Sequence, residues 1–308
     1  MWRNVDILQD TVYVITGPTA SGKSALAVSL AQRTDAEIIS ADSRQIYKGI
    51  PVLTAVPTEE ERGDIRHHLL ETLPLHAPFS AYAFEKEAVR ITGEIIRRGK
   101  RVIICGGSML YVKAFCEGLD EIPDIPAHIR ENICRQFETE GIDSIIDTLR
   151  MEDPLSASRI DLSNPRRIIH ALEVTRTAGT PYSSLLGNKK RCRGFDVVTV
   201  NLTCDRDILF NRINNRVDFM MNNGALEEAR RVYPLKNHNS LHTVGFNELF
   251  AYFEGKMDYD TAVARIAKNT RVFAKKQITW IKKNPCDHSI DISSPDAEDI
   301  LYNSLINV

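Results

Sequence analysis

Apolar runs and helical patterns alternate over the first third of the chain. Short apolar runs predict strands at 12–15, 37–40 and 101–105, and apolar residues at helical spacing predict a helix over 81–98. Strands that alternate with helices are typical of a parallel sheet with helices packed on its faces. This part of the chain therefore predicts an α/β fold.

The pattern changes after Gly118. From there to about 193 the apolar positions follow a helical period, prolines interrupt them, and no strand pattern stands out. A strand pattern returns once, at 196–202, and we expect this strand to rejoin the sheet. Helical patterns then follow at about 205–222, 224–233, 245–254 and 258–283. We therefore expect a core formed by 1–118 and 196–308, and a helical insertion domain at 119–195.

A phosphate-binding motif lies between the first predicted strand and the next helical pattern. It reads Gly17-Pro18-Thr19-Ala20-Ser21-Gly22-Lys23-Ser24. A G-x-x-x-x-G-K-[ST] string between a strand and a helix predicts a P-loop, whose backbone N–H groups surround an anion. Lys23 supplies a charge for the terminal phosphates, and the Ser24 hydroxyl is placed to hold Mg²⁺.

One carboxylate stands at a predicted strand end near this loop. Asp42 follows the 37–40 strand, whereas the 101–105 strand is followed by Gly106, Gly107 and Ser108. Open α/β sheets bind their ligands at the carboxyl ends of the strands. Asp42 is therefore a candidate metal ligand or general base, with a role as a turn cap as the alternative.

Composition and charge narrow the class of protein. The chain has 308 residues, a formal net charge of −2 and six cysteines without zinc spacing. Any binding of nucleic acid must therefore use local basic patches. No apolar run approaches the ~18 residues of a membrane span, and the first residues lack a signal-peptide pattern. We expect a cytoplasmic monomer.

A longer series of motifs begins at Asp42. The run from Asp42 to Gly49 reads D-S-R-Q-I-Y-K-G, and with the phosphate loop it resembles the tRNA dimethylallyltransferase (tRNA isopentenyltransferase) family, in the bacterial type without a zinc finger. Matching segments follow in order at 54–57, 67–69, 106–111, 164–167, 171–174, 212–217, 244–248 and 270–280. The resemblance covers about residues 10–283.

The resemblance implies a P-loop NTPase-like core and a reaction. A dimethylallyl group would move from its pyrophosphate to N6 of the adenine just 3′ of the anticodon in tRNA. The phosphate loop, residues 17–24, would hold the pyrophosphate with Mg²⁺ on Ser24. The implied catalytic residues are Asp42 as general base, Ser108 as an orienting hydroxyl and Arg216 as a second pyrophosphate clamp. Arg212 and Arg216 share a helix face.

The resemblance and the basic residues together predict a surface for the tRNA anticodon stem-loop. The candidate tRNA-binding residues are Asp42, Ser43, Arg44, Gln45, Ser108, Arg130, Arg166, Arg167, Lys268, Arg271 and Lys275. On the 258–283 helix we expect Lys268, Arg271, Lys275 and Lys282 to cluster on one side, opposite Ile266, Phe273 and Trp280. Basic residues of the insertion extend the surface: Arg159, Arg176, Lys189, Lys190, Arg191 and Arg193. A solvated charged helix face is the alternative for Lys268, Arg271 and Lys275.

The chain departs from the family pattern in a few side chains. Ser108 and Met109 stand where the family has Thr and Gly, Lys276 replaces an arginine, and Phe246 replaces a tyrosine. None of these changes removes a catalytic group. Two other functions stay open on the residues alone: a P-loop small-molecule kinase and an RNA-binding protein gated by a nucleoside triphosphate.

Overall fold

Two compact units make up the structure, a computed structural model that describes residues 11–187, 193–294 and 296–306. One unit consists of Met1–Glu117 with Cys192–Val308, and the other of Gly118–Arg191. The helical unit thus begins one residue before the predicted insertion and ends four residues before its predicted end.

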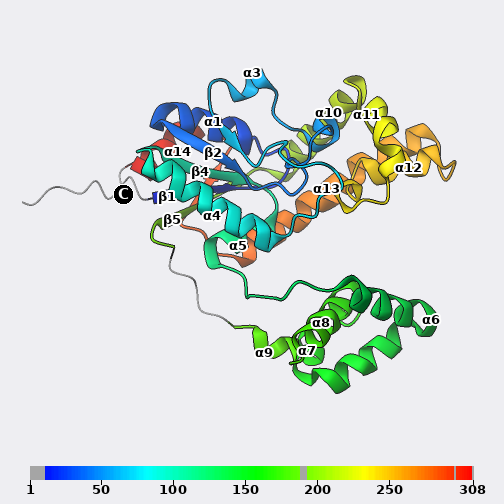
Figure 1. Cartoon of the computed structure of the whole chain (residues 1–308). Helices are drawn as coiled ribbons and strands as arrows, with labels where there is room; N and C mark the ends of the chain where they lie inside the picture. Colours follow the sequence, from blue (N-terminus) through cyan, green and yellow to red (C-terminus); the bar gives the residue numbers. More distant parts are fainter. Residues whose placement is uncertain (1–10, 188–192, 295, 307–308) are drawn as a thin grey trace, which may run out of the picture. The chain divides into compact units, whose positions relative to one another are not determined.

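The first unit is built on a parallel sheet of six strands in the order β3-β2-β4-β1-β5-β6 (Figure 1). Its strands are β1 Thr11–Thr16, β2 Ala36–Ser40, β3 His67–His68, β4 Arg101–Gly106, β5 Asp196–Thr203 and β6 His288–Asp291. The middle strands are buried along nearly their whole length because helices cover both faces of the sheet. The expected α/β fold is confirmed.

The last strand corrects one expectation. β6 pairs in parallel with β5, so a strand pattern returns twice after the helical unit and not once. In β6 only Ile290 is buried. Four residues with one buried apolar position carry no strand periodicity, so no pattern predicts this strand.

Helices lie on both faces of this sheet (Figure 1). Their bounds are α1 Lys23–Thr34, α2 Pro51–Thr54, α3 Glu59–Arg62, α4 Ala81–Arg97, α5 Met109–Glu117, α10 Arg206–Asn222, α11 Ala225–Val232, α12 Phe246–Phe253, α13 Tyr259–Lys283 and α14 Ala297–Ile306. The short 3-10 turns η1 and η2 span Tyr233–Leu235 and Asn239–Leu241. One core cluster joins Ile15 of β1, Leu30 of α1 and Leu301 of α14. None of the helices in the described residues is long and apolar enough to cross a membrane.

The second unit contains four helices in its described residues and has its own core. They are α6 Ala127–Glu152, α7 Pro154–Arg159, α8 Pro165–Ala178 and α9 Tyr182–Leu185. Ile133 and Leu149 of α6 pack with Ile168 and Leu172 of α8. The expected helical character of the insertion is therefore present.

The apolar side of α13 is only partly buried. Ile266 is 3% exposed, whereas Phe273, on the same apolar side, is 41% exposed. The helical period identifies the apolar side of a helix but not what covers it.

Candidate active site

The phosphate loop follows β1 and leads into α1. Gly22 has a φ of 82°, a left-handed conformation that lets the chain turn directly into the helix. The Lys23 Nζ donates a hydrogen bond to the carbonyl oxygen of Pro18 at 3.2 Å, so its ammonium lies over the loop. Burial lowers the pKa of Lys23 below its usual value of 10.5, and the nearby Asp42 carboxylate opposes that shift.

A glutamine from the far end of the chain holds this loop. Gln277 of α13 accepts a hydrogen bond from the backbone N–H of Thr19 at 2.8 Å through its Oε1. Its Nε2 donates to the carbonyl oxygen of Gly107 at 2.9 Å, and the residue is only 2% exposed. The side chain thus joins the phosphate loop to the turn after β4. Gln277 is not among the predicted site residues, although a polar residue in the buried row of an amphipathic helix is a signal in the sequence.

Two arginines of α10 reach the same loop. The Arg216 Nη1 donates to the Thr19 hydroxyl at 3.3 Å. A Cβ placed on Gly22 would lie 4.0 Å from the Arg212 Nη1. Burial lowers the pKa of Arg216, and Asp42 and Glu61 oppose the shift. Together with Lys23, the structure therefore brings three cationic side chains to one loop.

Close backbone packing brings Asp42 to the same sheet edge. The Ser108 N–H donates to the carbonyl oxygen of Ala41 at 3.2 Å. A Cβ on Gly106 would lie 2.2 Å from that oxygen, so any side chain there would force β2 and β4 apart. The Ser108 hydroxyl accepts from the Ser43 N–H at 2.8 Å. Asp42 and Ser108 are therefore neighbours, as the two predicted catalytic roles require.

The Asp42 carboxylate also organises its own turn. Its Oδ1 accepts from the backbone N–H of Arg44 at 2.8 Å and of Gln45 at 3.3 Å. This is the turn-capping role that the sequence left as an alternative. Both contacts use Oδ1. The carboxylate therefore caps this turn through one of its two oxygens, at the edge of the sheet.

The next two predicted tRNA-binding residues make contacts within the protein. The Gln45 Nε2 donates to the carbonyl oxygens of Thr54 and Ala55, and its Oε1 accepts from the Ser40 hydroxyl. The guanidinium of Arg44 donates to the carbonyl oxygens of Asn239 and His242. The side chains of residues 44 and 45 therefore hold loops together in this structure.

The predicted tRNA-binding residues of α13 and of the helical unit differ in their contacts within the protein. Arg271 donates to the side chain of Asn214, and the Lys275 ammonium lies 5.5 Å from the centre of the Phe210 ring, so both lie against α10. Arg130 forms a two-point ion pair with Glu173. The exposed residues of the predicted set are Arg130, Arg166, Arg167, Lys268 and Lys275.

Of the additional basic residues, Arg193 is misassigned and three lie outside the described residues. The side chain of Arg193 is 9% exposed and pairs with the buried Glu85 at 2.9 Å. The expectation that it belongs to a basic surface is wrong, because this ion pair buries it. Lys189, Lys190 and Arg191 lie outside the described residues. Arg176 pairs with Glu152.

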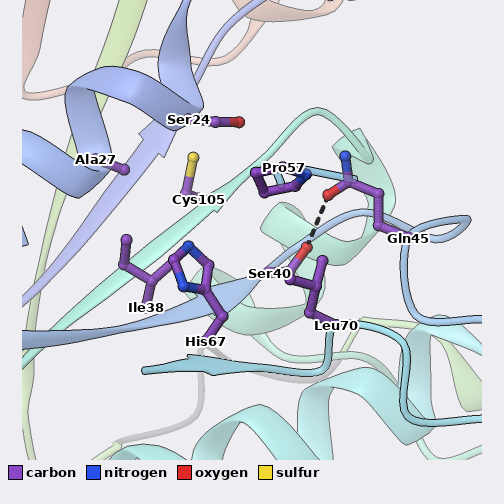
Figure 2. Close-up of a pocket in the computed structure, with 9 residues that line it drawn as sticks. All are labelled: Ser24, Ala27, Ile38, Ser40, Gln45, Pro57, His67, Leu70 and Cys105. Carbon is purple, nitrogen blue, oxygen red and sulfur yellow. Dashed lines mark hydrogen bonds between the residues drawn. The ribbon is translucent and has the colours of Figure 1, made fainter. Parts of the chain in front are cut away.

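A small pocket lies beneath the first turn of α1 (Figure 2). Ser24 and Ala27 of α1, Ile38 and Ser40 of β2, Gln45, Pro57, His67, Leu70 and Cys105 of β4 line it. Burial raises the pKa of the Cys105 thiol to about 11, so this cysteine is protonated at neutral pH. The pocket therefore offers hydroxyl, amide and imidazole groups but no thiolate nucleophile.

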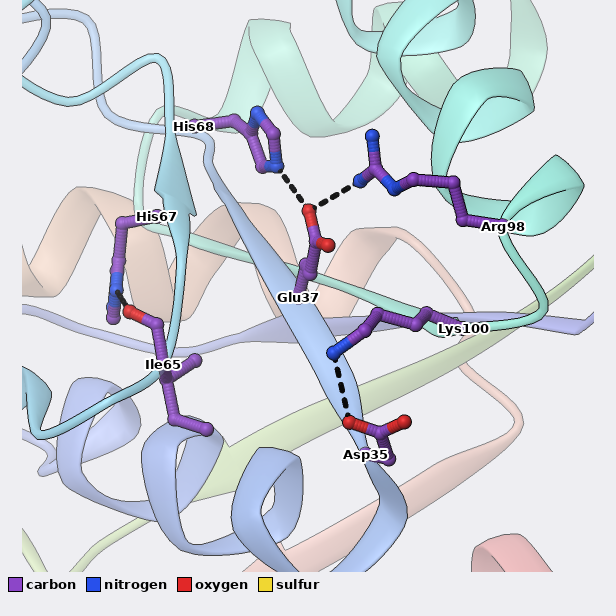
Figure 3. A network of polar contacts seen from close by, with 7 residues as sticks. All are labelled: Asp35, Glu37, Ile65, His67, His68, Arg98 and Lys100. Atoms are coloured by element: carbon purple, nitrogen blue, oxygen red, sulfur yellow. Dashed lines mark hydrogen bonds and ion pairs between the residues drawn. The ribbon is translucent and has the colours of Figure 1, made fainter.

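The adjacent histidines of β3 point to opposite sides of the strand (Figure 3). His67 hydrogen-bonds the carbonyl oxygen of Ile65 through Nδ1. The Nε2 of His68 and the guanidinium of Arg98 each lie 2.6 Å from the Oε2 of Glu37. No group of three His, Cys, Asp or Glu side chains within the described part of the chain could hold a metal ion. The contacts of both rings are with groups of the protein itself, Ile65 for His67 and Glu37 for His68.

The Glu37 network makes a testable contribution to stability. Burial raises the pKa of Glu37, but the hydrogen bonds from His68 and Arg98 outweigh it and bring the pKa below the usual 4.5. We expect Glu37→Gln to lower the free energy of unfolding at pH 7 by about 2 kcal/mol. A depressed pKa stabilises the fold above the unfolded-state pKa, so the difference should shrink as the pH falls below 4.5.

Denaturant unfolding at several pH values measures this effect. Glu94→Gln is the matched control, since Glu94 is 42% exposed and pairs with Arg90 on the helix surface. It should change stability by less than about 0.5 kcal/mol. An equal effect of the two substitutions, or one for Glu37→Gln that does not vary with pH, would contradict the assignment.

Comparisons with known proteins identify the family. Residues 45–284, well over half of the chain, match the model of the IPP transferase family. The chain is 43% identical over 296 residues to tRNA dimethylallyltransferase 2 of Parabacteroides distasonis, with 96% of this chain and 98% of that protein covered. The full-length tRNA isopentenylpyrophosphate transferase of Bacillus halodurans superposes with a TM-score of 0.70 at 31% identity, covering 97% and 96% of the two chains. A eukaryotic dimethylallyltransferase acting on tRNA gives a TM-score of 0.81 at 28% identity, covering 95% of this chain and 77% of that one. With a P-loop, a clustered acid and hydroxyl, and relatives that match over nearly its whole length, the chain belongs to the IPP transferase family.

Proposed function

We propose that this protein transfers a dimethylallyl group from dimethylallyl pyrophosphate to tRNA. The acceptor is N6 of the adenine adjacent to the anticodon on its 3′ side. The bond from the allylic carbon to the pyrophosphate oxygen breaks, the C–N6 bond forms, one N6 proton is taken up by a base, and pyrophosphate leaves. The observation that carries the proposal is the meeting of the cationic phosphate loop and Asp42 at one sheet edge, within electrostatic reach of each other.

The phosphate loop suits a leaving pyrophosphate. Lys23, Arg212 and Arg216 surround it, and the backbone N–H groups at the start of α1 add the positive end of the helix. These groups stabilise negative charge as it develops on the bridging oxygen. Arg216 is the second clamp, because its guanidinium is fixed to Thr19 within the loop itself.

The site also fits a Mg²⁺ ion. Ser24 is exposed at the first turn of α1 and presents a hydroxyl oxygen, a ligand that Mg²⁺ accepts beside phosphate oxygens and water. When bound, the ion would neutralise pyrophosphate charge as a Lewis acid. Pro18, Ala20 and Ser21 complete the loop around the anion.

Asp42 and Ser108 serve the acceptor base. The lone pair of an exocyclic adenine amine is delocalised into the ring, so a carboxylate that accepts the proton as the C–N bond forms assists the attack. Asp42 is the general base in this proposal. Ser108 is held by Ser43 beside it and orients the base or the pyrophosphate. The adenine must leave its stack to reach them.

The tRNA contacts in this proposal come from both units. Lys268, Arg166 and Arg167 are exposed and bind the phosphate backbone. Arg130, Arg271 and Lys275 would exchange their present partners for phosphates, and Arg44 and Gln45 would support the loop that carries Asp42 and Ser43. We further infer that the protein acts as a monomer in the cytoplasm, where tRNA is modified.

A thermal-shift comparison tests the donor assignment against the kinase alternative. Dimethylallyl pyrophosphate with Mg²⁺ should raise the unfolding temperature more than ATP with Mg²⁺ at equal concentration, because a ligand that binds the folded state stabilises it by mass action. Release of pyrophosphate should then require tRNA. A larger shift with ATP, or phosphate transfer to a small acceptor, would favour the kinase.

Replacement of Gln277 should impair catalysis through the phosphate loop. Gln277→Ala removes both hydrogen bonds that join Thr19 to Gly107, and a misplacement of the loop by about 1 Å costs on the order of 10²-fold. We expect that loss in kcat/KM for the donor, with tRNA affinity retained. Lys283→Ala, an exposed residue in the last turn of α13, is the control and should leave donor kcat/KM within about 3-fold. Unchanged donor kinetics in Gln277→Ala would remove this positioning role.

A further inference from the structure

Three residues on one row of α13 have contrasting environments. Asn269, Phe273 and Gln277 are spaced by four residues, so their side chains follow one another along one side of the helix. The Asn269 Nδ2 donates to the Oε1 of Glu248 in α12 at 2.7 Å, and Gln277 donates to Gly107 at 2.9 Å. Phe273, between them, is 41% exposed. The inner side of α13 is therefore covered one turn before and one turn after Phe273, but open at Phe273 itself.

This open turn lies next to the acceptor part of the candidate active site. Gln277 follows Phe273 by one helical turn, about 6 Å along the axis. The partner of Gln277 is Gly107, and the next residue, Ser108, binds Ser43. An exposed aromatic ring thus stands one turn away from Gln277, which binds the residue before Ser108.

An aromatic ring in this place suits a nucleobase. Single-stranded RNA is bound by stacking its unpaired bases on aromatic side chains, a contact worth ~1–3 kcal/mol per base. Exposed Lys276, three positions along α13, provides positive charge for the adjoining phosphates. Such a ring offers a flat apolar face without restricting which base stacks on it.

We propose that Phe273 stacks on a base of the anticodon loop that flanks the acceptor adenine. The inference rests on the proposed function and adds a positioning residue for the RNA substrate. We assign the ring to the flanking base and not to the acceptor adenine. The ring is half-exposed, whereas the acceptor has to pass farther in to reach Asp42. The stacked neighbour then fixes the loop while the acceptor is turned into the site.

The test compares two equally exposed positions of α13. Val272 is 40% exposed and precedes Phe273, but lies about 100° around the helix. We expect Phe273→Ala to raise KM for tRNA and weaken binding of an anticodon stem-loop about 10-fold. KM for dimethylallyl pyrophosphate and the unfolding temperature should stay unchanged. Val272→Ala should match the wild type, and Phe273→Tyr should restore RNA binding whereas Phe273→Leu should not.

A spectroscopic experiment reports the contact directly. Phe273→Trp is titrated with stem-loops that carry 2-aminopurine on either side of the acceptor adenine, and stacking at one of the two sites should quench its fluorescence. Equal RNA binding by Phe273→Ala and Val272→Ala, or no quenching at either site, would overturn the inference. Failure of the proposed function is recognised separately, since the wild-type protein would then transfer no prenyl group even where the binding difference persists.

Discussion

Lys23→Met should lower the rate of dimethylallyl transfer about 10³-fold, the largest single effect that we expect. The Lys23 ammonium lies over the phosphate loop and donates a hydrogen bond to the carbonyl oxygen of Pro18. The surrounding protein shields this ammonium from water. Charge that develops on the leaving pyrophosphate would lose its nearest fixed cation. Methionine keeps the length of the side chain, so the loss reports the charge. Transfer of labelled prenyl groups to tRNA under single-turnover conditions measures it.

The control removes the same charge elsewhere. Lys48→Met changes an exposed lysine and should leave the rate within about 2-fold. Because burial lowers the pKa of Lys23 below 10.5, kcat/KM for the donor should fall on the alkaline side before an ordinary lysine deprotonates. An activity for Lys23→Met near that of the control would show that the loop does not hold the leaving group.

Asp42→Asn should lower transfer about 10²-fold or more while tRNA affinity is retained. An asparagine side-chain oxygen can still accept from the backbone N–H groups of Arg44 and Gln45, so the turn is preserved. Only the capacity to take the N6 proton is lost. The measurement is single-turnover transfer, with stem-loop binding determined in parallel.

Comparison with Asp42→Ala separates the two roles of this carboxylate. Alanine removes both the base and the turn cap, so it should lose at least as much activity and also some stability, about 1 kcal/mol. If Asp42→Asn were as active as the wild type and only Asp42→Ala were impaired, Asp42 would be a structural residue and the general base would lie elsewhere.

The parts of the fold that could be predicted are those whose burial is uniform. β1 and β4 are covered on both faces and carry continuous apolar runs, and β2 is buried along its whole length around Ile38 and Ile39. The two-residue strand β3 and the edge strand β6 lack such a run, and their pairing depends on neighbours far along the chain. The phosphate loop was predictable for another reason, because its conformation is local and depends on its glycines.

The parts of the site that escaped prediction depend on distant contacts. Gln277 lies 258 positions after Thr19 and 170 after Gly107, and no local pattern links them. Arg193 was counted with the basic surface because its partner, Glu85, is 108 positions away. Phe273 follows the apolar period of α13, but its exposure depends on where α12 and the Gly107 turn lie. Tertiary packing decides each of these cases.

Mass spectrometry of the tRNA nucleosides tests the central claim most directly. The wild-type protein is incubated with Mg²⁺, isotopically labelled dimethylallyl pyrophosphate and an undermodified tRNA, and the tRNA is then digested. The proposed function predicts the labelled dimethylallyl group on N6 of the adenosine 3′ to the anticodon, with one pyrophosphate released per group transferred. Unmodified adenosine at that position, with ATP consumed or a small molecule phosphorylated in its place, would contradict it.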